Sequence, residues 1–407
     1  MARVVQISEC FPTNYKPLTG EFILRHAESL SDKCDVKVIV PLRFVPPREA
    51  ISSGVNGLFN WFKQNKNTAG YKSGRLSVEY MNYISLPRPR FELIDESIIT
   101  TLFRQKLKDK IISFSPDIIY CHWLRPWAAV AAGISEELGL PFIIDHHEDL
   151  PTLKKLFPKD YEKFLKPILN ANRVIVHSTA NLTELINEIP LLSNIELVYL
   201  GQSFDIAVED KTFSNDFVRF VCVSHLHEER KNIDILIKAL SLINSKLNFN
   251  LNILGDGPLK DRYISLVNEL GLADKIIFEG SKTQEEIRAS LDEADIFILP
   301  SFPEAFGIVF IEALARGLPV ITCKGNGGGE ELKNLSYPSV LAEPLSAEDL
   351  SDKILNLAGD VEQMKLMSAK GKELVKANFT HESNACRTIE VIAETKSQFQ
   401  REKIVRD

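Results

Sequence analysis

The chain has few cysteines and no long apolar run, and each absence excludes a class of protein. Its six cysteines, at positions 10, 34, 121, 222, 323 and 386, are widely scattered and form no Cys-x-x-Cys pair. The first ten residues, MARVVQISEC, read as the start of a strand and lack the apolar core of a secretory signal. We therefore expect reduced thiols in a cytoplasmic protein. No stretch approaches about 18 consecutive apolar residues, so any membrane contact should be peripheral, at the inner face.

The chain also lacks a surplus of basic residues. Its net charge is −7, which gives no basic face for phosphate neutralisation, so no nucleic-acid partner is expected. One segment differs. Residues 42–110 hold 12 Lys+Arg against 6 Asp+Glu, interspersed with Phe44, Phe59, Trp61, Phe62 and Phe91. This segment fits peripheral contact with anionic lipid, and the alternative is an ordinary solvated surface.

The length and the apolar pattern predict two α/β domains. A chain of 407 residues is too long for one ordinary core. Short Val/Ile/Leu runs such as ARVVQIS, DIIYCH, VRFVCVS and DIFILP alternate with amphipathic stretches, which is typical of doubly wound parallel sheets. The alternation stops over the polar residues 199–216 and restarts near residue 217. We expect one domain over 1–205, a second over 206–385, and a C-terminal helix over 386–407 that crosses back to the first. Ligands of such sheets bind in the cleft at the strand ends.

The stretch PSFPEAFGIVFIEALARGLPVI, residues 300–321, places two glutamates around an apolar segment. It predicts a strand that ends near residue 300, a loop, and a helix from about Gly307 to Arg316 closed by Gly317. The first N–H groups of such a helix suit a phosphate, and Gly307 lets the backbone approach it. Glu312 then lies within reach of a ribose diol, and Glu304 on the other side of the phosphate. The alternative is that Glu304 caps the helix and Glu312 lies on the surface.

Several motifs, in order along the chain, resemble one enzyme family. PSFPEAFGIVFIE resembles the E-x7-E signature of the retaining glycosyltransferases of family 4, and GNGGGEEL resembles their G-G-x-x-E segment. VSHLHEERKNIDILIKAL, LNILGDGPLK and KIIFEGSKTQEEI are similar to the strand, turn and helix motifs of the same family. In the first half, LTGEFILRHAESL, IIDHHEDLP and RVIVHST match its glycine loop, H-x-x-D stretch and serine-ended strand. The resemblance implies the GT-B fold, with two Rossmann-like domains that face an interdomain cleft.

The resemblance assigns roles to individual positions of this chain. It implies that Glu312 binds the ribose of a nucleotide, that Glu304 contacts the donor sugar, and that Lys231, aided by Arg230, neutralises the diphosphate. His146 would face the donor sugar and so completes the catalytic set. The remaining donor-binding positions are Phe306, Gly307, Ile308, Gly20, His225, Glu331 and Gly280. Taken singly, each has an ordinary structural explanation. His122 and His147 are expected to be structural.

Two positions depart from the family pattern. The family most often has V-G-R-L where this chain has VSHL, so His225 stands at the arginine position, and the loop that follows is one residue longer. Arg230 can replace the missing guanidinium, or the phosphate site is weaker. In YLGQSFD, residues 199–205, the glycine of the family's N-G-x-D is present and the asparagine is not.

The resemblance implies retaining transfer of a sugar from a nucleoside-diphosphate sugar, such as a UDP- or GDP-linked one, to a glycan or lipid-linked acceptor in bacterial surface polysaccharide synthesis. No D-x-D motif occurs, so we expect metal-independent transfer with no cofactor, in which Lys231, Arg230 and the helix beginning at Gly307 stabilise the leaving group. The first alternative is a catalytically silent nucleotide-binding or partner subunit, suggested by His225. A nucleotide-sugar 2-epimerase and a carbohydrate-binding protein are further alternatives.

Overall fold

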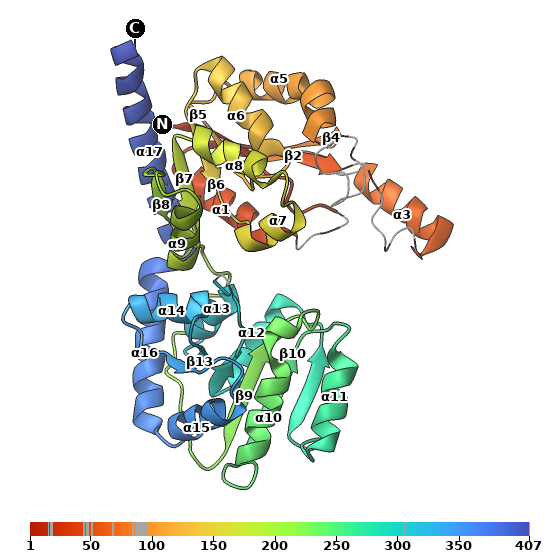
Figure 1. Ribbon diagram of the computed structural model, residues 1–407, viewed down its shortest axis with the longest axis vertical. Coiled ribbons are helices and arrows are strands. Elements are labelled where there is room, and N and C mark those ends of the chain that lie inside the picture. Colours follow the sequence, from red (N-terminus) through yellow and green to blue (C-terminus); the bar gives the residue numbers. More distant parts are fainter. Residues whose placement is uncertain are drawn as a thin grey trace. The chain divides into compact units, whose positions relative to one another are not determined.

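The computed structural model divides the chain into two compact units. Unit 1 comprises residues 1–177, 181–201 and 381–407, and unit 2 comprises 178–180 and 202–380 (Figure 1). The structure describes residues 1–406 except 15, 17–18, 44, 46–48, 50–51, 67–68, 84, 86–95 and 305. The expected boundaries, after residues 205 and 385, lie a few residues beyond these divisions of the chain.

Unit 1 is built on an eight-stranded sheet. Its strands are β1 (Arg3–Ile7), β2 (Asp35–Arg43), β3 (Tyr71–Ser73), β4 (Leu76–Tyr83), β5 (Ile118–His122), β6 (Phe142–Asp145), β7 (Arg173–Val176) and β8 (Ile195–Leu197). They lie in the order β3-β4-β2-β1-β5-β6-β7-β8, and all pairs are parallel except β3 with β4. The strand order reverses between β1 and β5, which makes their carboxyl ends a topological switch point, the usual ligand position in such sheets.

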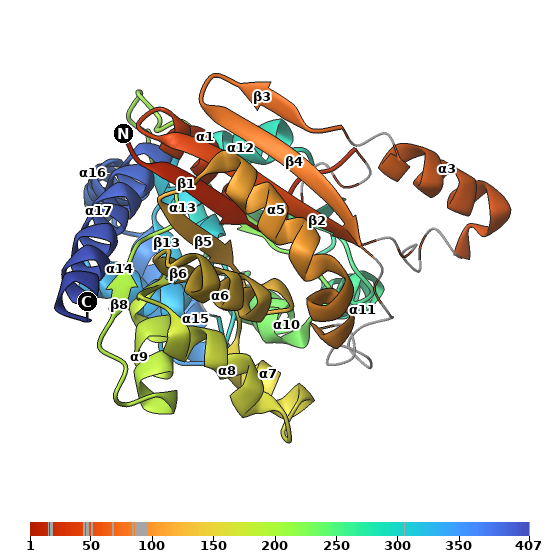
Figure 2. The same cartoon turned by 90° about the horizontal axis from the view of Figure 1, so that it is seen from above.

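Helices cover both faces of this sheet, because its strands are apolar on both sides (Figure 2). Adjacent residues of β1 illustrate this, since Val4 packs in the core beneath α1 and Val5 in the core beneath α5 and α6. The helices are α1 (Glu21–Ser31), α3 (Gly54–Lys66), the π-helix η1 (Ile99–Phe103), α5 (Arg104–Phe114), α6 (Trp127–Leu138), α7 (Leu150–Leu156), α8 (Tyr161–Asn170), α9 (Thr179–Glu188) and α17 (His381–Arg406).

The last helix, α17, belongs to unit 1 and packs on α1. Ala385, Val391 and Ile392 are buried in the same core as Val4 and Ile23. Polar contacts accompany this packing, since His26 Nε2 lies 3.2 Å from Thr388 Oγ1. The C-terminal helix therefore closes one face of the N-terminal sheet.

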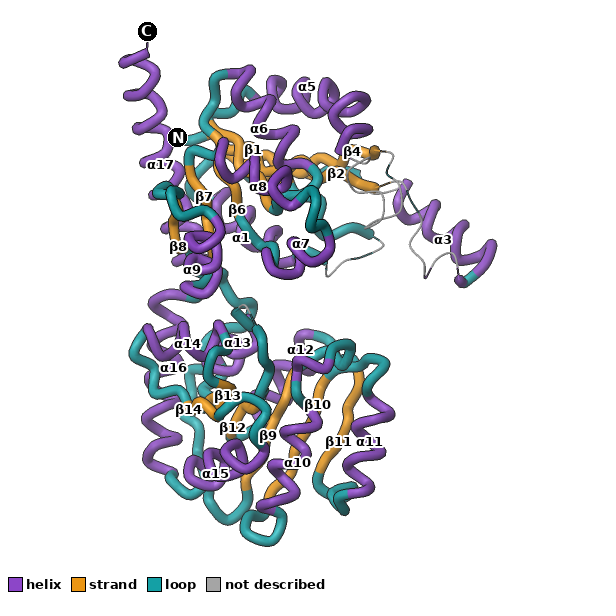
Figure 3. The backbone as a smooth tube through the Cα atoms, viewed as in Figure 1, coloured by secondary structure: helices purple, strands orange, loops and turns teal. Residues whose placement is uncertain are grey.

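Unit 2 contains a six-stranded parallel sheet (Figure 3). Its strands β9 (Val218–Val223), β10 (Phe249–Leu254), β11 (Ile276–Gly280), β12 (Ile296–Ile298), β13 (Val320–Cys323) and β14 (Val340–Ala342) lie in the order β11-β10-β9-β12-β13-β14. The helices are the 3₁₀ turn η2 (Glu229–Lys231), α10 (Ile233–Ile243), α11 (Lys260–Glu269), α12 (Gln284–Glu293), α13 (Ile308–Ala315), α14 (Gly327–Asn334), α15 (Ala347–Ala358) and α16 (Val361–Asn378). The order reverses between β9 and β12, so the switch point lies at their carboxyl ends.

Most elements expected from the apolar pattern are present, and residues 42–83 differ most from expectation. Here α3 spans 54–66, and residues 71–83 form the β3–β4 hairpin at the sheet edge, which an alternation of parallel strands and helices does not predict. Thus the first sheet is not wholly parallel. Phe44 and Phe91 of the basic segment lie outside the described residues. Within the described part of the chain, no helix is both long and apolar enough to cross a membrane.

We predict that α17 stabilises unit 1 mainly through its buried side chains. Ile392 is 2% exposed and Ile404, further along the same helix, is 77% exposed. Ile392→Ala should therefore lower the free energy of unfolding by about 2–5 kcal/mol, and Ile404→Ala should leave it nearly unchanged. All three tryptophans (Trp61, Trp123 and Trp127) lie in unit 1, so their fluorescence during urea unfolding reports this unit alone. Equal effects of the two changes would contradict the packing of α17.

Candidate active site

The centre of the candidate site in unit 2 is the loop that joins β12 to α13. Gly307 precedes α13 with φ 74° and ψ 74°, in the left-handed region that only glycine adopts readily. A Cβ at this position would also lie 2.5 Å from the Phe310 ring. The helix begins at Ile308, as the sequence predicts to within one residue, and Gly317 after it has φ 72°. The N–H groups of its first turn carry partial positive charge.

A second segment, which follows β9, is hydrogen-bonded to this loop. The Phe302 N–H donates to the Arg230 carbonyl at 2.7 Å, and Asn232 Nδ2 donates to the Pro300 carbonyl at 2.9 Å. Asn232 itself has φ 52°, a left-handed conformation that asparagine tolerates better than most residues. These bonds hold the turn η2 and the start of α10 against the end of β12. The two segments thus meet at the switch point of the sheet.

Opposite charges meet where these two segments touch. Lys231 Nζ lies 2.5 Å and Arg230 Nη1 lies 3.2 Å from Glu304 Oε2. The side chains of Lys231 and Glu304 are only 10% and 12% exposed. Burial alone would raise the pKa of Glu304, but the charges of Lys231 and Arg230 outweigh burial and hold that pKa below its ordinary value of 4.5. Two cations therefore share the Glu304 carboxylate, and Arg230 Nε also lies 2.5 Å from Glu228 Oε2, so the charges within the cluster are balanced.

Other residues singled out in unit 2 lie on the surrounding elements. Glu312 lies in the second turn of α13 and is 9% exposed. Phe306 is 7% exposed and its ring centroid lies 5.8 Å from that of Phe379. Gly280 ends β11 with φ 74°, and its carbonyl accepts from the Gly255 N–H at 2.8 Å. His225 follows β9 and is exposed.

Glu331 has a defined hydrogen-bond partner. This residue of α14 is 2% exposed and accepts from the Thr179 N–H at 2.5 Å and from the Thr179 hydroxyl at 3.0 Å. Residue 179 is grouped with unit 2 although α9 otherwise belongs to unit 1. Glu331 therefore holds the backbone and the side chain of Thr179, a residue of its own unit.

In unit 1 the two positions singled out lie at the carboxyl edge of the sheet. Gly20 precedes α1 with φ 71°, and a Cβ there would lie 2.3 Å from the Cys10 carbonyl oxygen, so no other residue fits without a backbone shift. His146 follows β6 and is 1% exposed. Its N–H donates to the Ile175 carbonyl at 2.9 Å, and its Nδ1 lies 3.3 Å from Glu148 Oε2. Glu148 in turn accepts a hydrogen bond from the Leu124 N–H.

Two family descriptions match almost the whole chain. "Glycosyl transferases group 1" matches residues 205–374, and "Glycosyltransferase Family 4" matches residues 20–203. The chain belongs to the family 4 type of glycosyltransferases. An uncharacterized glycosyltransferase of Methanocaldococcus jannaschii, MJ1178, is 28% identical over 269 residues, which cover 66% of this chain and 73% of that protein.

A further relative and a solved structure are similar over most of this glycosyltransferase. The putative teichuronic acid biosynthesis glycosyltransferase TuaC of Bacillus subtilis is 24% identical over 371 residues, which cover 86% of this chain and 88% of that protein. Anabaena HepE, solved in complex with UDP and glucose, superposes with a TM-score of 0.66 over 97% of this chain and 100% of that chain, at 18% identity. The fold is therefore of the expected GT-B type.

Sequence reasoning about this glycosyltransferase missed several residues that hold the site together. The buried side chain of Asn326 donates to the Ser301 carbonyl at 2.7 Å and accepts from the Gly329 N–H, so it ties the β12 loop to α14. An asparagine before a glycine-rich helix start is a capping signal that could have indicated this role. Asn232 gave no such signal, because only the fold shows its left-handed conformation.

We predict a pH-dependent contribution of Glu304 to the stability of unit 2. Because its pKa is lowered in the folded state, the contribution is fully present above the ordinary value of 4.5 and is lost as the pH falls through the lowered value. Glu304→Gln should therefore cost about 1.5–3 kcal/mol at pH 7 and progressively less below pH 4.5. The measurement is urea unfolding followed by circular dichroism, with the exposed Glu269→Gln as control. A pH-independent cost would contradict the ion pair.

Proposed function

We propose that this glycosyltransferase is a retaining enzyme that transfers a sugar from a nucleoside-diphosphate sugar to a glycan or lipid-linked acceptor in bacterial surface polysaccharide synthesis. The observation that carries the proposal is the cluster of Lys231, Arg230 and Glu304 beside the start of α13, at the switch point between β9 and β12. The UDP complex of HepE and the role named for TuaC are consistent with this donor and this pathway.

Each of the two domains would bind one of the two substrates. We assign the donor to the domain over residues 206–385 and the acceptor to the domain over 1–205, with the helix over 386–407 packed on the latter. Gly20 precedes α1 and has no side chain, so a phosphate could approach its backbone closely. His146 would contact the donor sugar, and Glu148 beside it would orient the imidazole.

The chemistry follows from the charges of the cluster. A departing diphosphate gains negative charge, which Lys231, Arg230 and the first N–H groups of α13 stabilise without a metal. Once the diphosphate engages Lys231 and Arg230, Glu304 becomes available to accept hydrogen bonds from hydroxyls of the donor sugar. Glu312, in the second turn of α13, would accept from the ribose hydroxyls. Phe306, Gly307, Ile308, His225, Glu331 and Gly280 complete the proposed donor-binding set.

The acceptor side includes a surface suited to a membrane. On α3, Val55, Leu58 and Phe59 are spaced along one side of the helix and are 83%, 36% and 67% exposed. This helix lies apart from the other helices of unit 1 (Figures 1 and 2). Exposed apolar side chains within a basic segment suit the interfacial region of an anionic bilayer. We therefore propose a cytoplasmic enzyme that contacts the inner face of the membrane through residues 42–110.

The first prediction concerns the donor. Thermal unfolding with UDP, GDP and ADP in turn should show stabilisation by one base, and about 2.7 kcal/mol is expected at a hundred times the dissociation constant. Glu312→Gln should weaken that nucleotide about 10–100-fold, because it loses charged hydrogen bonds to the ribose. The exposed Glu373→Gln serves as the control. Equal affinity of the Glu312 variant and the wild type for the nucleotide would contradict a role of Glu312 in binding the ribose.

The second prediction concerns turnover. Lys231→Met should lower kcat about 100–1,000-fold by removing a charge that stabilises the leaving group, whereas the exposed Lys246→Met should not. Release of nucleoside diphosphate from the donor found above is the readout, and the rate in metal-free buffer should not change on adding Mg²⁺ or Mn²⁺. A large gain with either ion would overturn metal-independent transfer. A wild type that binds the donor without any turnover would favour the silent-subunit alternative.

The third prediction concerns the membrane. Vesicles that contain anionic phospholipid should sediment the wild type, and Phe59→Asp should reduce the bound fraction several-fold by placing a charge on the inserted face. Leu191→Asp, at a position that is 95% exposed elsewhere in unit 1, is the matched control. Equal loss in both variants, or no binding of the wild type together with full activity on a soluble glycan, would contradict this surface.

A further inference from the structure

Unit 1 gathers most of the histidines of the chain at one place. Of eight histidines, five (His26, His122, His146, His147 and His177) lie on α1 or at the carboxyl ends of β5, β6 and β7. All of them except His146 line a small cavity, and the only carboxylate among the residues that line it is Asp145, the last residue of β6. The role proposed above uses His146 alone, so the other four histidines and Asp145 need a separate explanation.

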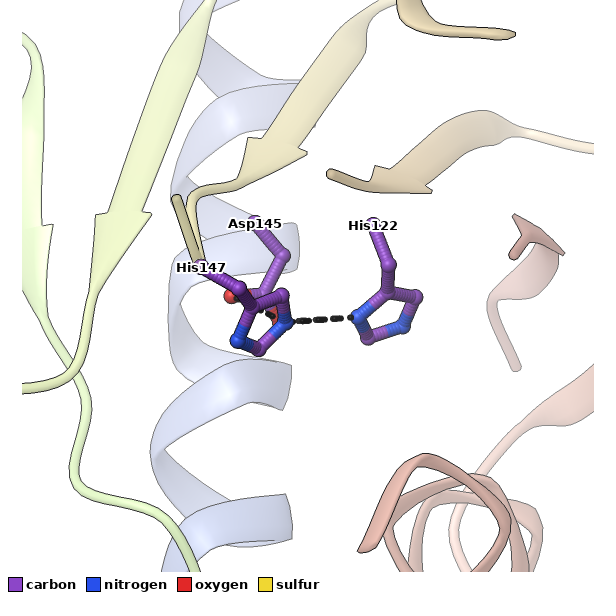
Figure 4. Close-up of side chains that lie close together, drawn as sticks. All are labelled: His122, Asp145 and His147. Atoms are coloured by element: carbon purple, nitrogen blue, oxygen red, sulfur yellow. Dashed lines mark hydrogen bonds and ion pairs between the residues drawn. The ribbon is translucent and has the colours of Figure 1, made fainter. Parts of the chain in front are cut away.

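Three side chains of this group point potential metal ligands at one another (Figure 4). His122 Nδ1 lies 3.3 Å from His147 Nε2 and 3.2 Å from Asp145 Oδ2. His147 Nε2 lies 3.4 Å from Asp145 Oδ1. All three side chains are at most 6% exposed. Nitrogen and oxygen ligands at about 2.0–2.1 Å from a tetrahedral zinc ion are about 3.3–3.4 Å apart, which is the spacing found here.

We propose that His122, Asp145 and His147 bind one divalent transition-metal ion of the zinc type. Imidazole nitrogen and carboxylate oxygen are ligands that this class of ion prefers. The cavity that these residues line has a volume of about 10 Å³, which is room for a single particle the size of a water molecule. His177 Nε2 lies 2.5 Å from Asp145 Oδ1, which is closer than two ligands of one tetrahedral ion can lie, so His177 pairs with Asp145 and a water molecule would take the fourth position.

The groups around these ligands are arranged as the outer shell of a metal site usually is. The Tyr120 hydroxyl donates to Asp145 Oδ2 at 2.6 Å and so fixes the orientation of this carboxylate. His177 Nδ1 lies 2.8 Å from the Val198 carbonyl and must donate to it, so Nε2 carries the lone pair when this ring is neutral. The first bond fixes the carboxylate of a ligand, and the second fixes the ring that pairs with this carboxylate.

A hydrogen-bonded network without an ion is the competing explanation. In that network Asp145 Oδ1 pairs with His177 Nε2 at 2.5 Å, and Asp145 Oδ2 accepts from the Tyr120 hydroxyl. His122 Nδ1 and His147 Nε2 face each other and share one hydrogen bond. After a rotation of the two rings, an ion would take the place of the shared proton.

The ion would have a structural role. It would join the end of β5 to the end of β6, and the pairing of His177 with Asp145 would add the end of β7. His146, which lies between two ligands, would thereby be held in place. This agrees with the structural role expected for His122 and His147. It does not alter the proposal of metal-independent transfer, which concerns the diphosphate and the residues of unit 2.

The test is metal analysis of the untagged full-length chain. After gel filtration in metal-free buffer, inductively coupled plasma mass spectrometry should find about one zinc equivalent per chain, as one site requires. Chain stripped with a chelator and loaded with Co²⁺ should show the strong visible ligand-field bands of a four-coordinate site. His147→Gln and Asp145→Asn should each lose these bands, and His225→Gln with His227→Gln, which removes an exposed pair in unit 2, should retain them.

Each outcome decides the question. Loss of the cobalt bands in the site variants, with circular dichroism like that of the wild type, supports the site. If His147→Gln fails to fold, metal content and cobalt spectrum of the wild type still decide. A folded wild type that retains no zinc and gives no four-coordinate cobalt spectrum overturns the proposal, and so does a signal that disappears only in the His225/His227 variant. Metal content is independent of glycosyl transfer, so failure here leaves the proposed function untouched.

Discussion

The candidate donor site depends on the contact between the segment after β9 and the loop after β12. Hydrogen bonds from Phe302 to the Arg230 carbonyl and from Asn232 to the Pro300 carbonyl join these segments, and Lys231 and Glu304 pair across the contact. The contact follows from topology, because reversal of the strand order places the ends of β9 and β12 next to each other. It brings two cations to the start of α13, where Glu304 and Glu228 pair with them in the absence of a ligand.

Unit 1 uses the same topological feature with different chemistry. Its sheet repeats the order of the second sheet and adds β3 and β8 at the edges. Where unit 2 has an ion pair and a helix start, unit 1 has buried rings around Asp145. Burial opposes ionisation of Asp145, but the charges of His177 and His147 outweigh it and hold its pKa well below its ordinary value. A charged carboxylate inside a protein needs such compensation, from protons or from a metal ion.

The sequence predicts the architecture well because buried parallel strands read as unbroken Val/Ile/Leu runs. It also predicts the start of α13 and its closing glycine, since Gly307 and Gly317 carry backbone conformations that other residues resist. It predicts less where a role depends on distant partners. The pairing of Lys231 with Glu304, the link from Asn326 to Ser301 and the meeting of His122 with Asp145 join residues that are 20 or more positions apart. The β3–β4 hairpin could not be predicted from apolar runs, because β3 is only three residues long and all three are exposed.

The most direct measurement of the central claim is amide hydrogen exchange with and without the nucleoside diphosphate that stabilises the protein. If the start of α13 and the turn before α10 hold the diphosphate, the amides of residues 306–310 and 229–232 should exchange more slowly in its presence. Saturating nucleotide that leaves residues 306–310 unprotected, or that protects another part of the chain instead, would contradict the account.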